Sequence, residues 1–267
     1  MKLLDLENPF RAPVYHEETV SSTMEIARAL AAQNEPHGTV ITADFQETGR
    51  GRNNRPWITE RGKNLIFTIL LRYSDAASMP KGLTLKTGLA VSLAVEDLVP
   101  ALVGMVKVKW PNDVMMGSRK VAGILTEGDG KIVCIGVGVN VTQKNFPEEC
   151  RSRAQSINKA SPALSDDARF TLLERVLCRL YAEIENPAMA DSQAGQLRTP
   201  KSWRERLVQR LYKIGETVTF AEGAAGSNSL IHGALTGIGP DGELLLHPKG
   251  ERKERSFTTG ELRVYKN

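Results

Sequence analysis

Residues 109–127, KWPNDVMMGSRKVAGILTE, decide how this chain folds, because they hold a strand end, a proline turn and the start of a buried strand. Lys109, Asn112 and Asp113 stand around the turn, and Lys120 begins the next strand. Polar groups that converge at strand ends are where open sheets usually place their ligands. The alternative, a surface turn with ordinary charges, explains Trp-Pro-Asn-Asp in succession poorly. The segment therefore predicts a ligand site within a sheet.

Further strands lie on both sides of this segment. VAGILTEGDGKIVCIGVGVNV at 121–141 predicts two strands joined at an Asp-Gly turn, which is a strong hairpin signal. HGTVITADFQ at 37–46 and the apolar run LIFTILLRY at 65–73 are typical of two more strands. The central sheet is therefore expected to be mixed, with antiparallel pairs.

Amphipathic segments are predicted to flank this sheet as helices. One begins at Ser22, because Ser22 and Glu25 have the spacing of a capping box. Others cover 80–99 and 166–186, and a shorter helix lies within 198–211. The fold class is therefore α/β (α+β), with a mixed central sheet between helices.

The pattern changes near Lys213 to short alternating runs, VTFAE, IHGALTGI, GELLLHP and ERSFTTGELRVY, separated by glycines and tight turns. Such runs are typical of a small antiparallel barrel of about 50 residues. A chain of 267 residues is long enough for one large and one small domain. We therefore expect a catalytic domain at 1–212 and a barrel domain at 213–267.

Composition excludes several classes of protein. A net charge of +4, from 35 basic and 31 acidic residues, is too mild to indicate nucleic acid as the main partner. Neither a signal peptide nor an apolar stretch long enough for a membrane span is evident, so a cytoplasmic location is expected. Cys134, Cys150 and Cys178 lack CxxC spacing, so we interpret them as buried or incidental thiols.

The segment QETGRGRNNRPW at 46–57 combines glycines, which allow the backbone to bend around a ligand, with three arginines. Arg50, Arg52 and Arg55 supply fixed positive charge, so the loop suits an anion. A solvated basic loop explains a single GRGR equally well, and Arg-Gly segments also occur in proteins that bind nucleic acids.

The segment GVGVNV at 136–141 leaves one face of a strand bare, so that a flat ligand can lie against the backbone, although close packing explains Gly-x-Gly as well.

A carboxylate and a phosphate repel each other, so a site that joins them requires cations where the two meet. Lys120 and Arg50 are the candidates for that position, and Asp113 is the candidate that helps to hold magnesium.

These motifs in this order, GRGR..R.W, KWPND with its Lys-Val-Ala-Gly-Ile-Leu strand and GVGVN, resemble the catalytic domain of biotin protein ligases over residues 15–213. The tail GELLLHP…FTTGELRV is similar to that family's C-terminal domain. The resemblance implies the class II aminoacyl-tRNA synthetase-like biotin/lipoate ligase fold, followed by an SH3-like barrel.

The resemblance also implies roles for single residues. The set expected to bind biotin is Ser22, Thr23, Gln46, Arg50, Gly51, Arg52, Lys120, Gly123 and Gly138. The set expected to bind ATP is Arg52, Arg55, Trp57, Asn112, Asp113, Lys120 and Asn140, with Asp113 near magnesium through the nucleotide. The expected catalytic residues are Arg50, Lys109 and Lys120. Trp57 either stacks on the ligand or anchors the loop, whereas Trp110 is expected in the core.

The implied activity is ATP-dependent biotinylation, with biotin, ATP and Mg²⁺ as reactants. Biotinyl-5′-adenylate forms under the closed Gly-Arg loop and is then transferred to a lysine of a biotin carboxyl carrier protein, such as that of acetyl-CoA carboxylase. Lys109 or Arg50 would stabilise the charge that develops during transfer. Sheet edges would allow a homodimer.

Three alternatives remain. A lipoate or octanoate ligase has a similar fold, and a binding-only module would hold biotin without activating it. A transcriptional repressor needs a helix-turn-helix, and only about fourteen residues precede the catalytic domain, so we expect a monofunctional enzyme that does not bind DNA. Two positions depart from the family pattern, which usually has Asn at Met24 and Arg at Tyr265.

Overall fold

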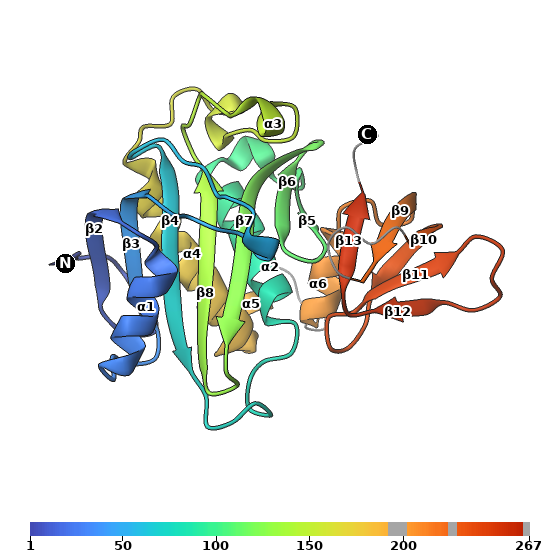
Figure 1. Ribbon diagram of the computed structural model, residues 1–267, viewed down its shortest axis with the longest axis horizontal. Helices are drawn as coiled ribbons and strands as arrows, with labels where there is room; N and C mark the ends of the chain where they lie inside the picture. The colour runs from blue at the N-terminus through green and yellow to red at the C-terminus, as the bar shows by residue number, and fades with distance from the viewer. Residues whose placement is uncertain (192–201, 224–228, 264–267) are drawn as a thin grey trace.

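The computed structural model describes residues 1–191, 202–223 and 229–263, which form a large and a small β-sheet (Figure 1). The large sheet has the order β1-β2-β3-β4-β8-β7-β6-β5 and the small sheet the order β12-β11-β10-β9-β13. The strands of the large sheet are β1 (Lys2–Leu3), β2 (Val14–Val20), β3 (Thr39–Gln46), β4 (Asn64–Arg72), β5 (Val106–Lys109), β6 (Asp113–Met116), β7 (Arg119–Gly128) and β8 (Ile132–Asn140). Those of the small sheet are β9 (Thr217–Glu222), β10 (Leu230–Ile238), β11 (Leu244–Pro248), β12 (Arg255–Phe257) and β13 (Gly260–Arg263).

The large sheet is mixed, as expected from the sequence. β2 and β3 run parallel, and the other neighbouring pairs are antiparallel. The expected strands at 37–46, at 65–73 and on both sides of the Asp-Gly turn are all present. The sequence did not predict β1, β2 or β6, because β1 has only two residues, β2 is rich in polar residues and β6 has only four residues after a turn.

Helices cover both faces of the large sheet (Figure 1). On one face lie α2 (Leu83–Leu98) and α4 (Ala168–Ile184), and on part of the other lies α1 (Thr23–Ala32). The remaining helices are α3 (Glu148–Arg151), α5 (Pro187–Asp191), α6 (Trp203–Gln209), η1 (Arg52–Asn54), η2 (Pro100–Leu102) and η3 (Ile157–Lys159). The expected amphipathic helices are thus confirmed. None of the helices in the described ranges is both long and apolar enough to cross a membrane.

The start of α1 differs from the expected capping box. Ser22 is the N-cap, but its hydroxyl accepts a hydrogen bond from the backbone N–H of Met24. Glu25 does not bond back to the N-cap, because its carboxylate accepts a 2.5 Å hydrogen bond from the Ser21 hydroxyl. The helix start was therefore predicted correctly and the type of cap was wrong.

Strand β4 shows why the run LIFTILLRY is apolar throughout. Side chains alternate between the two faces of a strand. Leu65, Phe67, Ile69 and Leu71 pack in the core beneath α2 and α4, whereas Leu70 packs against α1. A strand covered on both faces needs apolar residues at nearly every position.

Asp44, on β3, connects the outer strands of the large sheet to α4. Its carboxylate lies 2.9 Å from Nε2 of His16 and accepts a hydrogen bond of 2.6 Å from Arg169. Burial alone would raise the pKa of this carboxyl, but the hydrogen bonds from His16 and Arg169 bring it below its ordinary value. The carboxylate form therefore stabilises the fold.

The small antiparallel sheet shares its core with α2 and α6. Phe220 and Phe257 pack with Leu85 and Leu89 of α2 in one apolar cluster. Trp110 is 2% exposed in this cluster and donates a hydrogen bond of 3.0 Å from Nε1 to the carbonyl of Gly242, so its expected core position is confirmed. The small sheet is antiparallel as expected, and its closure into an SH3-like barrel stays a prediction.

The outer edge of β5 is covered by the segment that leads to the small sheet. Val108 donates to the carbonyl of Arg210 and accepts from the N–H of Tyr212, each at 2.8 Å. This backbone pairing, together with the shared apolar cluster, joins the two sheets. The expected boundary between residues 212 and 213 stays a prediction.

Candidate functional site

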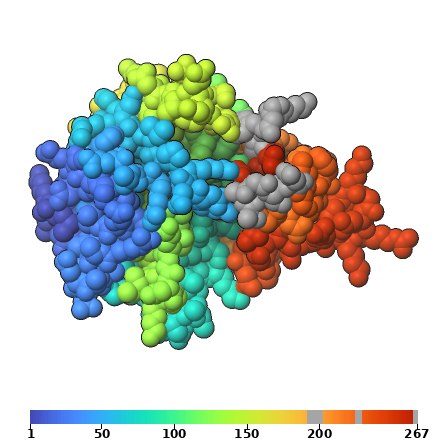
Figure 2. Space-filling view, in the orientation of Figure 1, coloured from blue at the N-terminus to red at the C-terminus, as the bar shows by residue number. Residues whose placement is uncertain are grey.

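A pocket of about 410 Å³ lies on the face of the large sheet that α1 leaves open. Its lining comes from the start of α1, from the loop between β3 and β4, from β4, β7 and β8, and from the end of the small sheet. The light-blue segment after β3 crosses in front of β8 and reaches β7 (Figure 1), and Figure 2 shows its atoms lying over the strands toward the C-terminal sheet. This volume is within the range of small-molecule sites.

The register of the large sheet brings the expected residues into one row. Neighbouring strands pair Ile66 with Gly138, Gly138 with Gly123, Gly123 with Asp113 and Asp113 with Lys109. Residues directly opposite each other in neighbouring strands face the same side. A row across five strands therefore runs from an apolar end to a charged end.

The charged end consists of two lysines around one carboxylate. Nζ of Lys120 lies 2.6 Å from Oδ1 of Asp113, and Nζ of Lys109 lies 3.8 Å from Oδ2. Burial alone would raise the pKa of Asp113, but the two lysines bring it below its ordinary value. Burial lowers the pKa of Lys109, and Asp113 opposes that change. Two cations thus share one anion, which leaves positive charge for an anionic ligand.

The bare strand face predicted from GVGVNV exists, and the indole of Trp57 lies against it. A Cβ added to Gly138 would stand 2.3 Å from Cε2 of Trp57, and one added to Gly123 would stand 3.1 Å from Cζ3. Nζ of Lys120 lies over the same ring, 5.3 Å from its centroid. Nε1 of Trp57 is buried without a hydrogen-bond partner among the described residues. Both predicted roles of Trp57, stacking and anchoring, fit this position.

The Gly-Arg loop folds into a small hairpin. Arg50 and Pro56 pair as an antiparallel bridge, Gly51 donates to the carbonyl of Arg55 at 2.8 Å, and η1 forms the tip. Nη1 of Arg52 donates to Oδ1 of Asn112 at 3.3 Å, which fixes the tip to the segment before β6. The loop between two strands that the sequence predicted is therefore a hairpin with hydrogen bonds within the loop and to Asn112.

The small sheet holds the same loop from the other side. Both terminal nitrogens of Arg55 donate to the carboxylate of Glu261 on β13, each at 3.2 Å. Burial opposes ionisation of Glu261, yet the hydrogen bonds from Arg55 hold its pKa below the ordinary value. The C-terminal sheet thus contributes a charged partner to the pocket.

The other end of the pocket carries neutral hydrogen-bonding groups. Oε1 of Gln46 accepts from the N–H and the hydroxyl of Thr23, at 2.8 and 3.0 Å. The hydroxyl of Thr68 donates to that of Thr23 at 2.8 Å. Ser22 and Met24 complete this end, where Cε of Met24 would meet a Cβ on Gly136 at 3.0 Å. Hydroxyl and amide groups suit a neutral polar ligand group.

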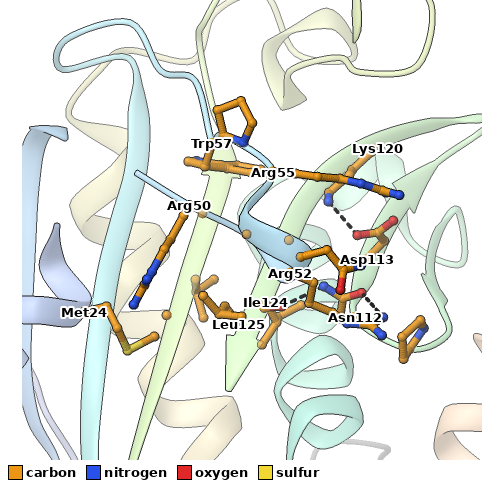
Figure 3. Close-up of a pocket in the computed structure, with 18 of the residues that line it drawn as sticks. Met24, Arg50, Arg52, Arg55, Trp57, Asn112, Asp113, Lys120, Ile124 and Leu125 are labelled. Atoms are coloured by element: carbon orange, nitrogen blue, oxygen red, sulfur yellow. Dashed lines mark hydrogen bonds and ion pairs between the residues drawn. The ribbon is translucent and has the colours of Figure 1, made fainter. Parts of the chain in front are cut away.

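Arg50 lines the pocket but does not point toward the two lysines. Figure 3 shows its guanidinium directed toward Met24, away from Lys120 and Asp113. Nη2 of Arg50 lies 3.6 Å from Oε2 of Glu127 on β7. The sequence led us to expect Arg50 and Lys120 at one meeting point, and the structure places them in one pocket with different partners.

Nearly all predicted site residues line this single pocket. Those found in its lining are Ser22, Thr23, Gln46, Arg50, Gly51, Arg52, Arg55, Trp57, Lys109, Asn112, Asp113, Lys120, Gly123 and Gly138. Asn140 is not among the lining residues. It stands at the end of β8, is 3% exposed and donates to the carbonyl of Gln155 at 3.2 Å, so its role in ATP binding stays a prediction.

The sequence analysis missed two residues that line the pocket, Thr68 and Glu261, and Glu127, which pairs with Arg50 from outside it. Thr68 is the one polar residue within LIFTILL, and that exception was an available signal. Glu127 and Glu261 gave no such signal, because each pairs with an arginine of the Gly-Arg loop that is distant in sequence. Within the described part of the chain, no cluster of three metal-ligating side chains occurs.

Comparison with known proteins agrees with this geometry. Residues 17–140 match the model described as "Biotin/lipoate A/B protein ligase family". The chain is 35% identical over 161 residues, 57% of its own length and 48% of the relative, to the "Bifunctional ligase/repressor BirA" of Bacillus spizizenii. It thus spans about half the length of this relative. The "Biotin--[acetyl-CoA-carboxylase] ligase" of Mycobacterium tuberculosis is 34% identical over 179 residues, 65% of this chain and 66% of the relative.

Solved structures show the same architecture. The chain resembles the biotin protein ligase of Aquifex aeolicus in complex with biotin and ATP, with a TM-score of 0.72 and 27% identity. The similarity covers 94% of this chain and 97% of that one. The expected fold, a large mixed sheet between helices with a C-terminal antiparallel sheet, is therefore confirmed.

Proposed function

Because residues 17–140 belong to the biotin/lipoate A/B protein ligase family, we propose that this chain is an ATP-dependent biotin protein ligase. The observation that carries the proposal is the polarity of the pocket. Neutral hydrogen-bonding groups lie at one end, around Thr23 and Gln46, and cations gather at the other, around Lys120. Biotin has the same polarity, with a ureido ring at one end and a carboxylate at the other.

The ureido ring supports biotin over lipoate as substrate. Its two N–H groups and one carbonyl need acceptors and a donor, which Ser22, Thr23 and Gln46 supply. The dithiolane ring of lipoate offers no such groups and would cover these polar side chains without forming hydrogen bonds to them, which costs binding energy. The Aquifex aeolicus structure, which contains biotin and ATP, supports the same choice.

In the first step, a carboxylate oxygen of biotin attacks the α-phosphorus of ATP, and pyrophosphate leaves to give biotinyl-5′-adenylate. Lys120 and Arg50 reduce the repulsion between the carboxylate and the phosphate. Arg52, Arg55, Asn112 and the indole of Trp57 hold the nucleotide, with the loop and Glu261 keeping water from the anhydride. Asn140, the last residue of β8, is assigned to the nucleotide side of the site.

In the second step, the neutral amine of an acceptor lysine attacks the biotinyl carbonyl, AMP leaves with the bonding pair of the broken C–O bond, and the nitrogen loses a proton to water to give the amide. Lys109 is buried beside Asp113 and close to Lys120, so it stabilises negative charge on the departing phosphate without solvent screening. The acceptor is a lysine of a biotin-accepting carboxylase carrier domain, which corresponds to the printed name of the Mycobacterium tuberculosis relative.

Magnesium is proposed to enter with the phosphates of ATP. Asp113 is the predicted magnesium residue, but both of its oxygens lie near lysine ammonium groups. A single carboxylate neutralised in this way does not make a protein metal site. We therefore assign no step of the reaction to a protein-held metal ion.

The organisation of the chain is also part of the proposal. We propose a catalytic domain at 1–212, an SH3-like domain at 213–267, a cytoplasmic location and a homodimer formed through a sheet edge. Two separate sheets support the division. Because segment 210–212 covers β5, the edge of the large sheet that remains for a second copy is the one beside β1.

ATP–pyrophosphate exchange with biotin, lipoate and octanoate in parallel tests the activation step. We expect exchange with biotin, and exchange with lipoate alone would overturn the proposal. Lys120→Ala should abolish exchange, whereas Lys107→Ala, whose ammonium donates to the carbonyl of Gln209 outside the pocket, should retain it. Mass spectrometry of a carboxylase carrier domain after incubation with the chain, ATP, magnesium and biotin tests transfer through the addition of one biotinyl group.

A further inference from the structure

Glu127 lies on the pocket side of β7 but outside the residues that line the pocket, close to the end of the strand at Gly128. Alternation along β7 puts Gly123, Leu125 and Glu127 on one face of the sheet, and the first two line the pocket. The carboxylate of Glu127 is 30% exposed and lies beside the side chain of Arg50. The sheet therefore places a negative charge next to the arginine proposed to bind the substrate carboxylate.

One oxygen of Glu127 serves two arginines. Oε2 accepts a hydrogen bond from Arg28, which projects from α1, and the same oxygen is 3.6 Å from Nη2 of Arg50. The contact with Arg28 is a hydrogen bond, whereas the contact with Arg50 is an ion pair at a longer distance. Arg28 thus takes up part of the charge that would otherwise hold Arg50.

The direction of the Arg50 side chain shows the effect of the negative charge on Glu127. Its guanidinium lies toward Met24 and Glu127 rather than toward Lys120 (Figure 3). Among the residues that the structure describes, Glu127 is the acidic side chain within ion-pair distance of Arg50. For Arg50 to meet an anion beside Lys120, it must exchange Glu127 for that anion.

We infer that Glu127 is a positioning residue that competes with the carboxylate of the substrate for Arg50, and that Arg28 weakens this competition by sharing the same oxygen. The inference rests on the proposed function. It explains why an arginine that lines an anion-binding pocket is paired with a carboxylate just outside that pocket. It also assigns a role in substrate affinity to Glu127 and Arg28, which both lie outside the pocket lining.

Calorimetric titration with biotin and with its neutral primary amide, biotinamide, tests this competition. The two probes share the ureido ring and the side chain, and only biotin carries the charge that Glu127 opposes. Glu127→Gln should lower the dissociation constant for biotin by about twofold to fivefold, the range expected for a partly exposed ion pair. Arg28→Gln should raise it by a similar factor, and neither variant should change the affinity for biotinamide.

The background variant Arg50→Gln separates competition from a general change of charge. If Glu127 acts through Arg50, then Glu127→Gln has no further effect on biotin affinity in that background, whereas a long-range field effect persists. Equal changes for biotin and biotinamide would mean a structural role and would overturn the inference, as would no change for biotin. A wild-type chain that binds neither probe would instead refute the proposed function.

Discussion

Replacement of Gly138 by alanine should lower the activity of the site while leaving the stability of the sheet nearly unchanged. A Cβ at this position would stand 2.3 Å from Cε2 and 2.5 Å from Nε1 of Trp57, whereas an ordinary contact is at least 3.4 Å. Gly138 pairs with Ile66 on one side and Gly123 on the other, so the backbone of β8 has little freedom to move. The indole ring must therefore move away from the strand by about 1 Å.

This change should affect activity much more than stability. Misplacement of a group over a reacting ligand by about 1 Å costs on the order of 100-fold in rate, so adenylate formation should fall by about that factor. Glycine inside a strand is less stable than alanine by roughly 0.5–1 kcal/mol. The free energy of unfolding should therefore stay within about 1 kcal/mol of the wild-type value, with the lost packing of Trp57 opposing the gain.

ATP–pyrophosphate exchange measures the first effect, and urea unfolding measures the second. Gly237→Ala is the matched control, since a Cβ there would meet only Cδ1 of Leu245, at 3.9 Å, and it should leave exchange unchanged. Tryptophan emission of Gly138→Ala should shift to longer wavelength as Trp57 becomes more exposed. Exchange within threefold of the wild type, or a loss of stability of several kcal/mol, would refute this reasoning.

Other perturbations test the remaining contacts. Glu261→Gln should raise KM for ATP by about twofold to fivefold, because Arg55 loses its partner, and the difference should narrow at high salt; no change in KM would argue against a role in nucleotide binding. Thr68→Val should weaken biotin binding about fivefold in calorimetry by removing a hydroxyl worth about 1 kcal/mol, and unchanged affinity would place Thr68 outside the recognition of the ring. Asp44→Asn should lower the free energy of unfolding by about 2 kcal/mol at neutral pH, since a charged carboxylate loses its hydrogen bonds to Arg169. Because the folded pKa of Asp44 lies below its ordinary 3.8, its stabilisation is present above that pH and is lost as the pH falls further, so the wild type should lose more stability on acidification than the variant.

The sequence predicted the elements of this fold better than their pairing. Apolar periodicity located β4 and α2, and the Asp-Gly turn located the β7–β8 hairpin, because local residues determine these elements. Trp110 was placed in the core correctly. The short strand β6 follows a turn and is too short to show a periodic pattern. Its strand conformation is evident only from its pairing with β5 and β7 in the structure.

The site was predicted in its members and not in its arrangement. The motifs GRGR and KWPND identified the cationic residues of the site, because charged residues beside glycine or at a strand end are easily recognised in a sequence. The contact of Arg50 with Glu127 depends on how the β3–β4 loop crosses the sheet, which no local pattern encodes. The same holds for the contact of Arg55 with Glu261, which joins residues separated by 206 positions.

The row that joins Ile66, Gly138, Gly123, Asp113 and Lys109 makes the position of insertions and deletions decisive. Removal of one residue from β7 between Gly123 and its end at Gly128 would turn the following side chains to the opposite face of the sheet. The turn at 129–131 lies between β7 and β8, so a change of length there does not alter which face the side chains of either strand occupy. Loops of a different length can therefore be grafted at that turn. Within the strands, a change of length would move site residues to the opposite face of the sheet, although all of them would still be present in the sequence.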